Sequence, residues 1–382
     1  MDIAPQMTTR FSRPSIDAKA LEYFQISLES GEIGGDGPFT TKCHEWLRAS
    51  LGTSALLTHS CTGALEMTAL LAEVGPGDEV IMPSYTFTST ANAFVLRGAT
   101  PVFTDIREDT LNLDERLLAQ AWSPCTKAIV PVHYAGVACD MDAICAFAKA
   151  HGLLVIEDAA QALGASHKGM PLGTLGDLGC LSFHVTKNVV SGEGGALILN
   201  NRSFVERAHI IREKGTNRTQ FINHKVDKYE WLDLGSSYLP SDLLAAVLLS
   251  QLERSGEIVA RRLAVWNRYH AAFETAERRG LLRRPVVPDY AGHNGHIYYL
   301  LLPDASSSEE FRKRLSGRRI PLQTHYVPLH SAPAGRRFGR TATGMNVTER
   351  TAATLVRLPI HAELSDQAVD DILGVALQAA GA

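Results

Sequence analysis

At 382 residues, the chain is long enough to form two domains, each with its own hydrophobic core. Hydrophobic residues make up 45% and charged residues 20%, as in ordinary soluble proteins, and the formal net charge of −4 argues against a nucleic-acid-binding protein. No apolar run reaches the length of a membrane span, and the N-terminus lacks the apolar stretch of a signal peptide. We therefore expect a cytoplasmic protein that binds neither nucleic acid nor membrane.

Helix-like and strand-like segments alternate from about residue 54. Apolar residues at helical spacing predict helices at 62–75, 89–99 and 140–152, each ending at or beside a glycine. Short apolar runs predict strands at 78–84, 100–106, 126–134 and 153–160. This alternation indicates an α/β domain with a mostly parallel sheet that is covered on both faces.

The pattern changes after residue 250. One long helix is predicted at 255–280, strands at 296–303 and 321–328, and a helix at 306–317 whose capping box would be Ser306 and Glu309. We therefore divide the chain into three parts. They are an N-terminal arm or helix at 1–34, a large α/β domain at 35–255 and a smaller C-terminal α+β domain at 256–382.

The six cysteines form no Cys-x-x-Cys pair, and none lies near a histidine at zinc-finger spacing. The sequence therefore predicts reduced thiols and no metal site.

A dinucleotide-binding fold is the first alternative for such an α/β domain, and it needs Gly-x-Gly-x-x-Gly between a strand and a helix. Here Gly192, Gly194 and Gly195 lead into a strand instead, and no Gly-x-x-x-x-Gly-Lys-Ser/Thr loop is present. Nicotinamide and ATP chemistry are therefore disfavoured.

Four separated pieces of sequence suit pyridoxal 5'-phosphate (PLP). This cofactor needs a lysine amine for its aldehyde, a carboxylate for its ring nitrogen, an anion site and a flat contact for its ring. Lys187, close to the glycines, is the lysine candidate, and a solvated hairpin lysine is the alternative. Asp158 is the carboxylate candidate, because it ends a predicted parallel strand while Glu157 points to the opposite face. A helix cap is the alternative for Asp158.

The phosphate site is predicted at the start of the helix that contains Thr62 and Gly63, where free N–H groups and the helix dipole favour an anion. Ser182 is positioned to add another donor, and Phe87 or Tyr85 would supply the flat contact. Each of these residues alone also suits a structural role as a cap or core residue. Only their joint occurrence in this order points to a PLP site.

The stretches SFHVTKN…GEGGA, EDAAQALG and SCTGALEM resemble the DegT-type family of PLP-dependent nucleotide-sugar aminotransferases, and the resemblance covers nearly the entire chain. It implies fold-type I, the aspartate aminotransferase-like fold, and a homodimer with shared active sites. Longer stretches such as IVPVHYAGVACDMDAI and VDKYEWLDLGSSYL are similar to the TDP-4-keto-6-deoxy-D-glucose 4-aminotransferases of the enterobacterial common antigen and antibiotic-sugar pathways.

The resemblance also implies roles for single residues. Lys187 would hold PLP and then move a proton of the amino donor, and Asp158 would pair with the ring nitrogen. Gln161 would hydrogen-bond the ring hydroxyl, and Phe87 would stack on the ring. The phosphate would be held by Thr62, Gly63 and Ser182. Ser237 stands where many relatives carry an asparagine that reaches the partner subunit's cofactor phosphate.

The implied reaction moves an amino group from L-glutamate to C4 of TDP-4-keto-6-deoxy-D-glucose, with pyridoxamine phosphate as the intermediate form of the cofactor. The product would be TDP-4-amino-4,6-dideoxy-D-glucose or -galactose. Alternatives are a sugar 3-aminotransferase of the same family and a non-catalytic PLP-binding regulator.

Substrate contacts are expected from Lys214, Tyr326 and His330. Arg212 and Arg218 are further basic candidates for a diphosphate or for the glutamate carboxylate. The alternative for this basic group is an ordinary basic helix end, and the alternative for His330 is a structural histidine.

Overall fold

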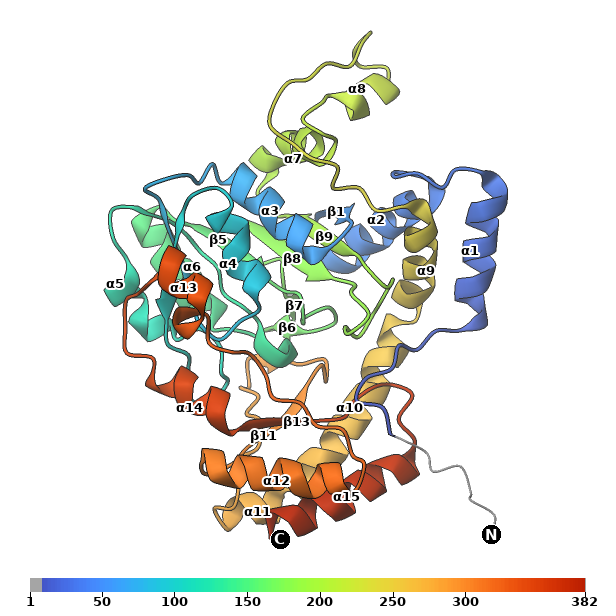
Figure 1. Ribbon diagram of the computed structural model, residues 1–382. Helices are drawn as coiled ribbons and strands as arrows, with labels where there is room; N and C mark the ends of the chain where they lie inside the picture. The colour runs from blue at the N-terminus through green and yellow to red at the C-terminus, as the bar shows by residue number, and fades with distance from the viewer. Residues whose placement is uncertain (1–8, 382) are drawn as a thin grey trace.

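The computed structural model describes residues 9–381, so residues 1–8 of the predicted arm and Ala382 lie outside the described part (Figure 1). Its centre is an eight-stranded sheet with the order β1–β9–β8–β5–β4–β2–β3–β12. These strands are β1 Ser54–Thr58, β2 Glu79–Pro83, β3 Thr100–Thr104, β4 Thr126–Ile129, β5 Leu154–Asp158, β8 Leu178–Ser182, β9 Gly195–Leu199 and β12 Arg340–Thr341.

The sheet is mostly parallel. The strands from β8 to β12 in this order run parallel to their neighbours, whereas β9 is antiparallel to both β1 and β8. The four strands predicted between residues 78 and 160 are present as β2, β3, β4 and β5, which confirms the α/β class. The carboxyl ends of these parallel strands share one edge of the sheet, where ligands bind in open α/β folds.

Helices cover both faces of the sheet, because successive strand residues point to opposite faces. On β9, Leu197 and Leu199 pack into one core with α3 and α4, while Ala196 and Ile198 pack into another with α2 and α9. The helices of the first face are α3 Cys61–Leu71, α4 Thr88–Val95 and α7 Val205–Arg212. Those of the second face are α2 Pro38–Leu51, α5 Leu118–Ala121, α6 Met141–His151 and α9 Asp242–Glu253.

Helix α1 (Ala18–Ser30) packs along α9 at the side of the molecule, and α8 (Arg218–Ile222) projects beyond the sheet (Figure 1). Three short strands form a separate small sheet, β6 Ser166–His167, β7 Met170–Pro171 and β10 Ala291–Gly292.

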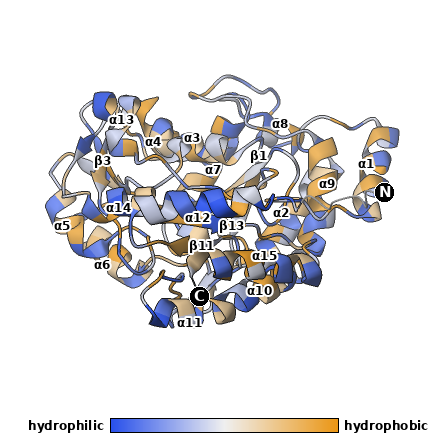
Figure 2. Cartoon of the chain, turned by 60° about the horizontal axis from the view of Figure 1, so that its bottom comes forward, coloured by the Kyte–Doolittle hydropathy of each residue, from blue (hydrophilic) through white to orange (hydrophobic). Residues whose placement is uncertain are grey.

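The C-terminal part has a core of its own. Strands β11 (Tyr298–Leu301) and β13 (Leu355–Leu358) pair antiparallel and pack against helices α10, α12 and α15. These helices span Ser255–Ala272, Ala305–Gly317 and Asp366–Ala380, and the shorter helices of this part are α11 Glu274–Arg278, α13 Pro333–Phe338 and α14 Asn346–Thr354. Figure 2 shows that α12 presents mainly hydrophilic residues outward, as expected for a helix that covers one side of a core. The domain boundaries at 34 and 255 stay predictions.

The structure corrects three details of the C-terminal prediction. The predicted long helix is two helices, because non-helical backbone at Phe273 separates α10 from α11. The N-cap of α12 is Asp304, which accepts from the Ser307 N–H, so the capping box predicted at Ser306 is wrong. The strand β12, which was not predicted from the sequence, joins the large sheet although it comes from the C-terminal part.

The strand predicted at 321–328 does not form. This segment has a single bridge, between Gln323 and Arg357. Prolines stand at both of its ends, and the backbone of Tyr326 is left-handed with φ of 35°, so the ladder cannot continue. Within residues 9–381, every helix is too short or too polar to cross a membrane.

Candidate active site

A cavity of about 970 Å³ opens at the carboxyl end of the parallel strands. We call one side the sheet wall; it contains Thr62, Phe87, Asp158, Ser182 and Lys187. We call the opposite side the C-terminal wall; it contains Gln323, His325, Tyr326 and Arg357. Residues 9–12 also line the cavity, so the N-terminal segment lies against the site.

Lys187 lies in the connection between β8 and β9. The backbone of this connection bonds to itself, since the Lys187 N–H donates to the His184 carbonyl at 2.9 Å and the Val185 N–H to the Gly192 carbonyl at 2.8 Å. Gly192 has a φ of 91°, which a residue with a side chain rarely adopts. A Cβ at Gly195 would lie 2.4 Å from the Cys61 backbone N, so this glycine lets β9 pack directly on the start of α3. The glycines thus place Lys187 beside that helix.

The Lys187 amine is enclosed by the cavity walls, and this burial lowers its pKa below the ordinary lysine value. The nearby Cys61 and Asp158 act in the opposite direction, and the positive charge of Arg357 lowers the pKa further. An amine in these surroundings is neutral at a lower pH than an exposed lysine.

Asp158 and Glu157 point to opposite faces of β5, as strand alternation predicts. Asp158 faces the cavity, and its carboxylate accepts from Thr90 Oγ1 at 2.7 Å and from the Ala160 N–H at 3.2 Å. Glu157 is fully buried on the other side, where His133 and the N–H groups of three residues in the 173–176 loop surround its carboxylate. Glu157 therefore holds a loop in place, and Asp158 is the carboxylate available to a ligand.

The start of α3 lies next to Ser182 at the end of β8. Thr62 Oγ1 is 2.7 Å from Ser89 Oγ, and Thr62, Ser89 and Ser182 all line the cavity. Gly63 is not in the lining; its N–H donates to Ser60 Oγ at 3.0 Å. The helix N-terminus and three hydroxyls together suit an anion.

Phe87 and Tyr85 differ in position. Phe87 lines the cavity and is 58% exposed, whereas Tyr85 is buried in an aromatic cluster with Tyr134 and Tyr326. Of the two candidates, only Phe87 presents a ring to the cavity.

Gln161 and Tyr326 lie at the junction of the two walls. Gln161 Nε2 donates to the Tyr326 hydroxyl at 2.8 Å, and its Oε1 accepts from the Ala135 N–H at 2.7 Å. The ring of His325 stacks on that of Tyr326 with centroids 3.7 Å apart, and its Nδ1 lies 2.8 Å from the Tyr134 hydroxyl. Burial lowers the pKa of His325 well below its ordinary value, so it is a neutral polar contact.

His325 and Arg357 were missed from the sequence. Arg357 had a detectable signal, because it is the single charged residue of the apolar strand β13. His325 directly precedes the predicted residue Tyr326 but has no signal of its own.

Several predicted residues lie outside this cavity lining. Ser237 is exposed and forms a bridge with Glu213, and Lys214 is exposed and paired with Glu213 at 2.9 Å. His330 Nδ1 is 2.7 Å from Ser84 Oγ, which fits the structural alternative.

Neither of the other basic candidates lies in the lining. Arg212 is buried, where it pairs with Asp36 at 2.7 Å and donates to the Leu57 carbonyl, so it has no free donor edge for a substrate. Arg218 pairs with Glu213 at 2.9 Å. The predicted anion-binding role of Arg212 is therefore wrong, because its contacts with Asp36 and Leu57 occupy its guanidinium.

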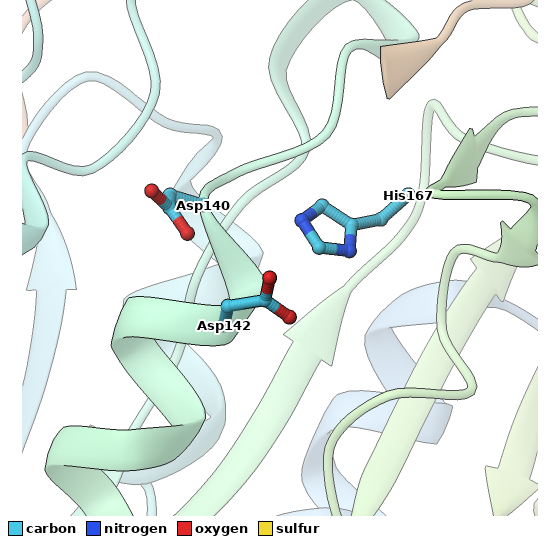
Figure 3. A group of neighbouring side chains, drawn as sticks. All are labelled: Asp140, Asp142 and His167. Atoms are coloured by element: carbon cyan, nitrogen blue, oxygen red, sulfur yellow. The ribbon is translucent and has the colours of Figure 1, made fainter. Parts of the chain in front are cut away.

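Asp140, Asp142 and His167 form a group that could surround a cation (Figure 3). Asp142 is already paired with Lys168, and Asp140 caps α6 by accepting from the Ala143 N–H at 3.1 Å. These contacts give both carboxylates structural roles. The absence of a metal site stays a prediction.

The side chains of the sheet wall fit PLP. They offer an enclosed amine, a fixed carboxylate, an anion-binding helix start and an aromatic ring in one cavity. Lys187, Asp158, Thr62, Ser182 and Phe87 are the residues that would contact it.

Comparisons with known proteins agree with this geometry. The model of the DegT/DnrJ/EryC1/StrS aminotransferase family matches residues 14–376. The chain is 35% identical over 376 residues to the spore coat polysaccharide biosynthesis protein SpsC of Bacillus subtilis, covering 95% of each chain.

Solved structures are similar over almost the full length. The aminotransferase TlmJ from Streptoalloteichus hindustanus is 31% identical with a TM-score of 0.89, covering 98% of this chain and 99% of that one. The PLP form of the putative sugar aminotransferase Spr1654 from Streptococcus pneumoniae is 27% identical with a TM-score of 0.88, covering 98% of this chain and 99% of that one.

Proposed function

We propose that this chain moves an amino group from L-glutamate to C4 of TDP-4-keto-6-deoxy-D-glucose. The chain belongs to the DegT/DnrJ/EryC1/StrS aminotransferase family and is therefore a PLP-dependent sugar aminotransferase of fold-type I. The observation that carries the reaction is the enclosed Lys187 amine in the same cavity as the fixed Asp158 carboxylate. The C4 position and the TDP-sugar rest on the similarity of the longer sequence stretches. A cytoplasmic location remains part of the proposal.

PLP, when bound, supplies an aldehyde that takes up an amine and a ring that withdraws electrons from the adjacent carbon. Lys187 would hold the aldehyde and, once displaced, would accept the proton from Cα of the amino donor. Only a neutral amine can accept that proton, and burial of Lys187 raises the neutral fraction by lowering its pKa. The same amine would deliver a proton to the sugar carbon that receives the nitrogen.

The other sheet-wall residues bind and orient. Asp158 would hold the proton on the ring nitrogen, because Thr90 and the Ala160 N–H fix its carboxylate toward the cavity. Thr62 and Ser182 would bind the phosphate at the start of α3. Gln161 would hydrogen-bond the ring hydroxyl, and its contact with Tyr326 fixes its orientation.

The role in carbohydrate biosynthesis is supported by the relative SpsC, whose name places it in polysaccharide biosynthesis. The aminated sugar would then be incorporated into an antibiotic or into a surface polysaccharide. Family membership disfavours the non-catalytic regulator considered from the sequence.

The test is to incubate the PLP-loaded protein with ¹⁵N-labelled L-glutamate and TDP-4-keto-6-deoxy-D-glucose and to examine the product by NMR. We expect ¹⁵N bonded to C4, and the ring couplings then assign the glucose or galactose configuration. Label on C3 would instead establish the 3-aminotransferase. A reaction with glutamate but with no aminated sugar would remove the substrate assignment.

A homodimer with shared active sites is the second part of the proposal. Large apolar side chains are exposed on and after α8, with Trp231 80% exposed, and such a surface is typical of a binding interface. Ser237 and Lys214 lie next to this surface and outside their own cavity, as the Lys214 N–H donates to the Ser236 carbonyl at 3.0 Å. In the proposed dimer they would serve the partner's site, Ser237 at the cofactor phosphate and Lys214 at the substrate.

Light scattering tests this arrangement. The wild-type protein should have the mass of a dimer, and Trp231→Glu should give monomers without activity, because a charge would be buried at the interface. A fully active monomer would contradict the shared site.

A further inference from the structure

We propose that His296 positions the Lys187 amine by accepting a hydrogen bond from it on Nε2, the ring nitrogen that carries no proton. This inference rests on the proposed function and deepens it, because it assigns the side chain that orients the amine while that amine moves protons.

His296 lies in the connection between β10 and β11, and its buried side chain lines the cavity that contains Lys187. Its backbone is held on both sides, since the His296 N–H donates to Asn294 Oδ1 at 3.1 Å and Arg262 donates to the His296 carbonyl at 2.7 Å. Asn294 in turn donates to the Gln161 carbonyl at 2.8 Å, in the turn that follows β5. The His296 ring is therefore carried by a segment that is fixed to the sheet wall.

Asn188, the residue after Lys187, decides which nitrogen of the His296 ring carries the proton. His296 Nδ1 lies 2.8 Å from Asn188 Oδ1, and Asn188 Nδ2 donates to the Asn294 carbonyl at 3.0 Å. Because an amide oxygen can only accept, Nδ1 is the protonated nitrogen of the neutral ring. Burial lowers the pKa of His296 well below its ordinary value, so the ring stays neutral and Nε2 keeps a free lone pair.

The Lys187 amine has no partner that holds it. It makes no hydrogen bond within residues 9–381, although the cavity walls enclose it. After burial, the charge of Lys187 contributes most to lowering the pKa of His296, so the amine and the ring lie close to each other. A long lysine side chain samples many rotamers, and a hydrogen bond through one N–H would restrict them and leave the lone pair for Cα of the donor.

Two other histidines line the described part of the cavity, and their contacts differ. The His184 ring bonds within its own turn, with Nδ1 2.8 Å from Thr186 Oγ1. The His325 ring stacks on Tyr326 at the junction of the walls. Of these three rings, that of His296 is the one bonded to the neighbour of the cofactor lysine.

The first experiment reads the hydrogen bond in the cofactor-free protein by NMR of ¹⁵N-labelled histidine. The signal of His296, identified by its absence from His296→Gln, should show a protonated Nδ1 and an unprotonated, hydrogen-bonded Nε2. Lys187→Met should shift the Nε2 resonance toward that of an unbonded nitrogen and leave Nδ1 in place. The matched control is Lys149→Met, which removes an exposed lysine of α6 and should shift neither resonance. An unmoved Nε2, or an equal movement of both nitrogens as from charge alone, would overturn the inference.

The second experiment follows the reaction of PLP-loaded protein with saturating L-glutamate in a single half-reaction. His296→Asn keeps a donor near the Nδ1 position but loses the acceptor at Nε2, and it should slow the reaction by about 10-fold, the scale of one hydrogen bond. The isotope effect of L-[α-²H]glutamate should rise, because proton transfer then limits the rate more strongly.

Two further variants complete this experiment. His296→Gln restores an acceptor near the Nε2 position and should recover the rate to within about threefold of wild type. The matched control is His293→Asn, whose ring packs on Trp266 outside the cavity lining, and it should react within about twofold of wild type. An unchanged unfolding temperature shows that each variant is folded.

Failure of the inference and failure of the proposed function can be told apart. If wild type does not react with L-glutamate, the donor assignment fails, while the NMR experiment still decides whether the contact exists. If wild type reacts and His296→Asn keeps both the rate and the isotope effect, only the inference fails. A slower reaction with an unchanged isotope effect would give His296 a role other than positioning the amine and would also overturn the inference.

Discussion

The two walls of the cavity are built in different ways. Sheet-wall residues stand at strand ends and at a helix start, and their positions follow from local backbone geometry, as with Lys187 in its self-bonded turn. C-terminal-wall residues are held by side chains far away in the sequence, as with Tyr326 on Gln161 and His325 on Tyr134. The difference suggests a division of labour in which the sheet wall performs the chemistry and the C-terminal wall selects and orients what reacts.

The largest effect should follow a change in the sheet wall. Lys187→Ala should lower the transamination rate by at least about 10²–10⁴-fold, the range for loss of a general base. The assay is product formation under single-turnover conditions. A variant that keeps more than a tenth of the wild-type rate would contradict the role of this amine.

The next effect compares two neighbours on β5. Asp158→Asn should lower the rate by about 100-fold, the usual scale for loss of a preorganised charge contact, with little change in folding stability. Glu157→Gln should lower the free energy of unfolding by about 2 kcal/mol, because its carboxylate accepts several buried N–H groups. Kinetics and urea unfolding measured on both variants check the pair, and the reverse pattern would show that the two roles are exchanged.

The contrast between the walls also explains what the sequence could predict. Strand alternation separates Asp158 from Glu157, and the glycines after Lys187 reflect a close backbone approach that small residues alone permit. The break at Phe273 and the left-handed backbone of Tyr326 leave no mark in the apolar pattern, whereas the prolines that flank the segment 321–328 were readable from the sequence. Arg357 joins the cavity lining only because the fold brings β13 to the same cavity as Lys187.

A smaller effect is expected at the junction of the walls. Tyr326→Phe removes the hydroxyl that accepts from Gln161 and should weaken cofactor binding by about fivefold, near 1 kcal/mol for a neutral hydrogen bond. The rate with saturating cofactor should change less than the affinity. Equilibrium titration with PLP measures the affinity, and a rate loss as large as that of Asp158→Asn would place Tyr326 in the chemistry instead.

The smallest effect is on stability and depends on pH. In the cofactor-free protein, the lowered pKa of Lys187 means that the unfolded chain binds this proton more tightly than the folded chain. The penalty is therefore greatest below the lowered pKa and disappears as the pH rises to the ordinary value of 10.5. Lys187→Met should unfold at a higher temperature than wild type at neutral pH, and the difference should narrow toward pH 10.5. A difference that does not vary with pH would show that the amine is not desolvated.

The most direct measurement traps the lysine that holds the cofactor. Borohydride reduction of the PLP-loaded protein, followed by digestion and mass spectrometry, should place the cofactor mass on the peptide that contains Lys187, and Lys187→Ala should carry no label. Label on a different lysine, or equal labelling of several exposed lysines, would contradict the assignment of this cavity as the site of amino transfer.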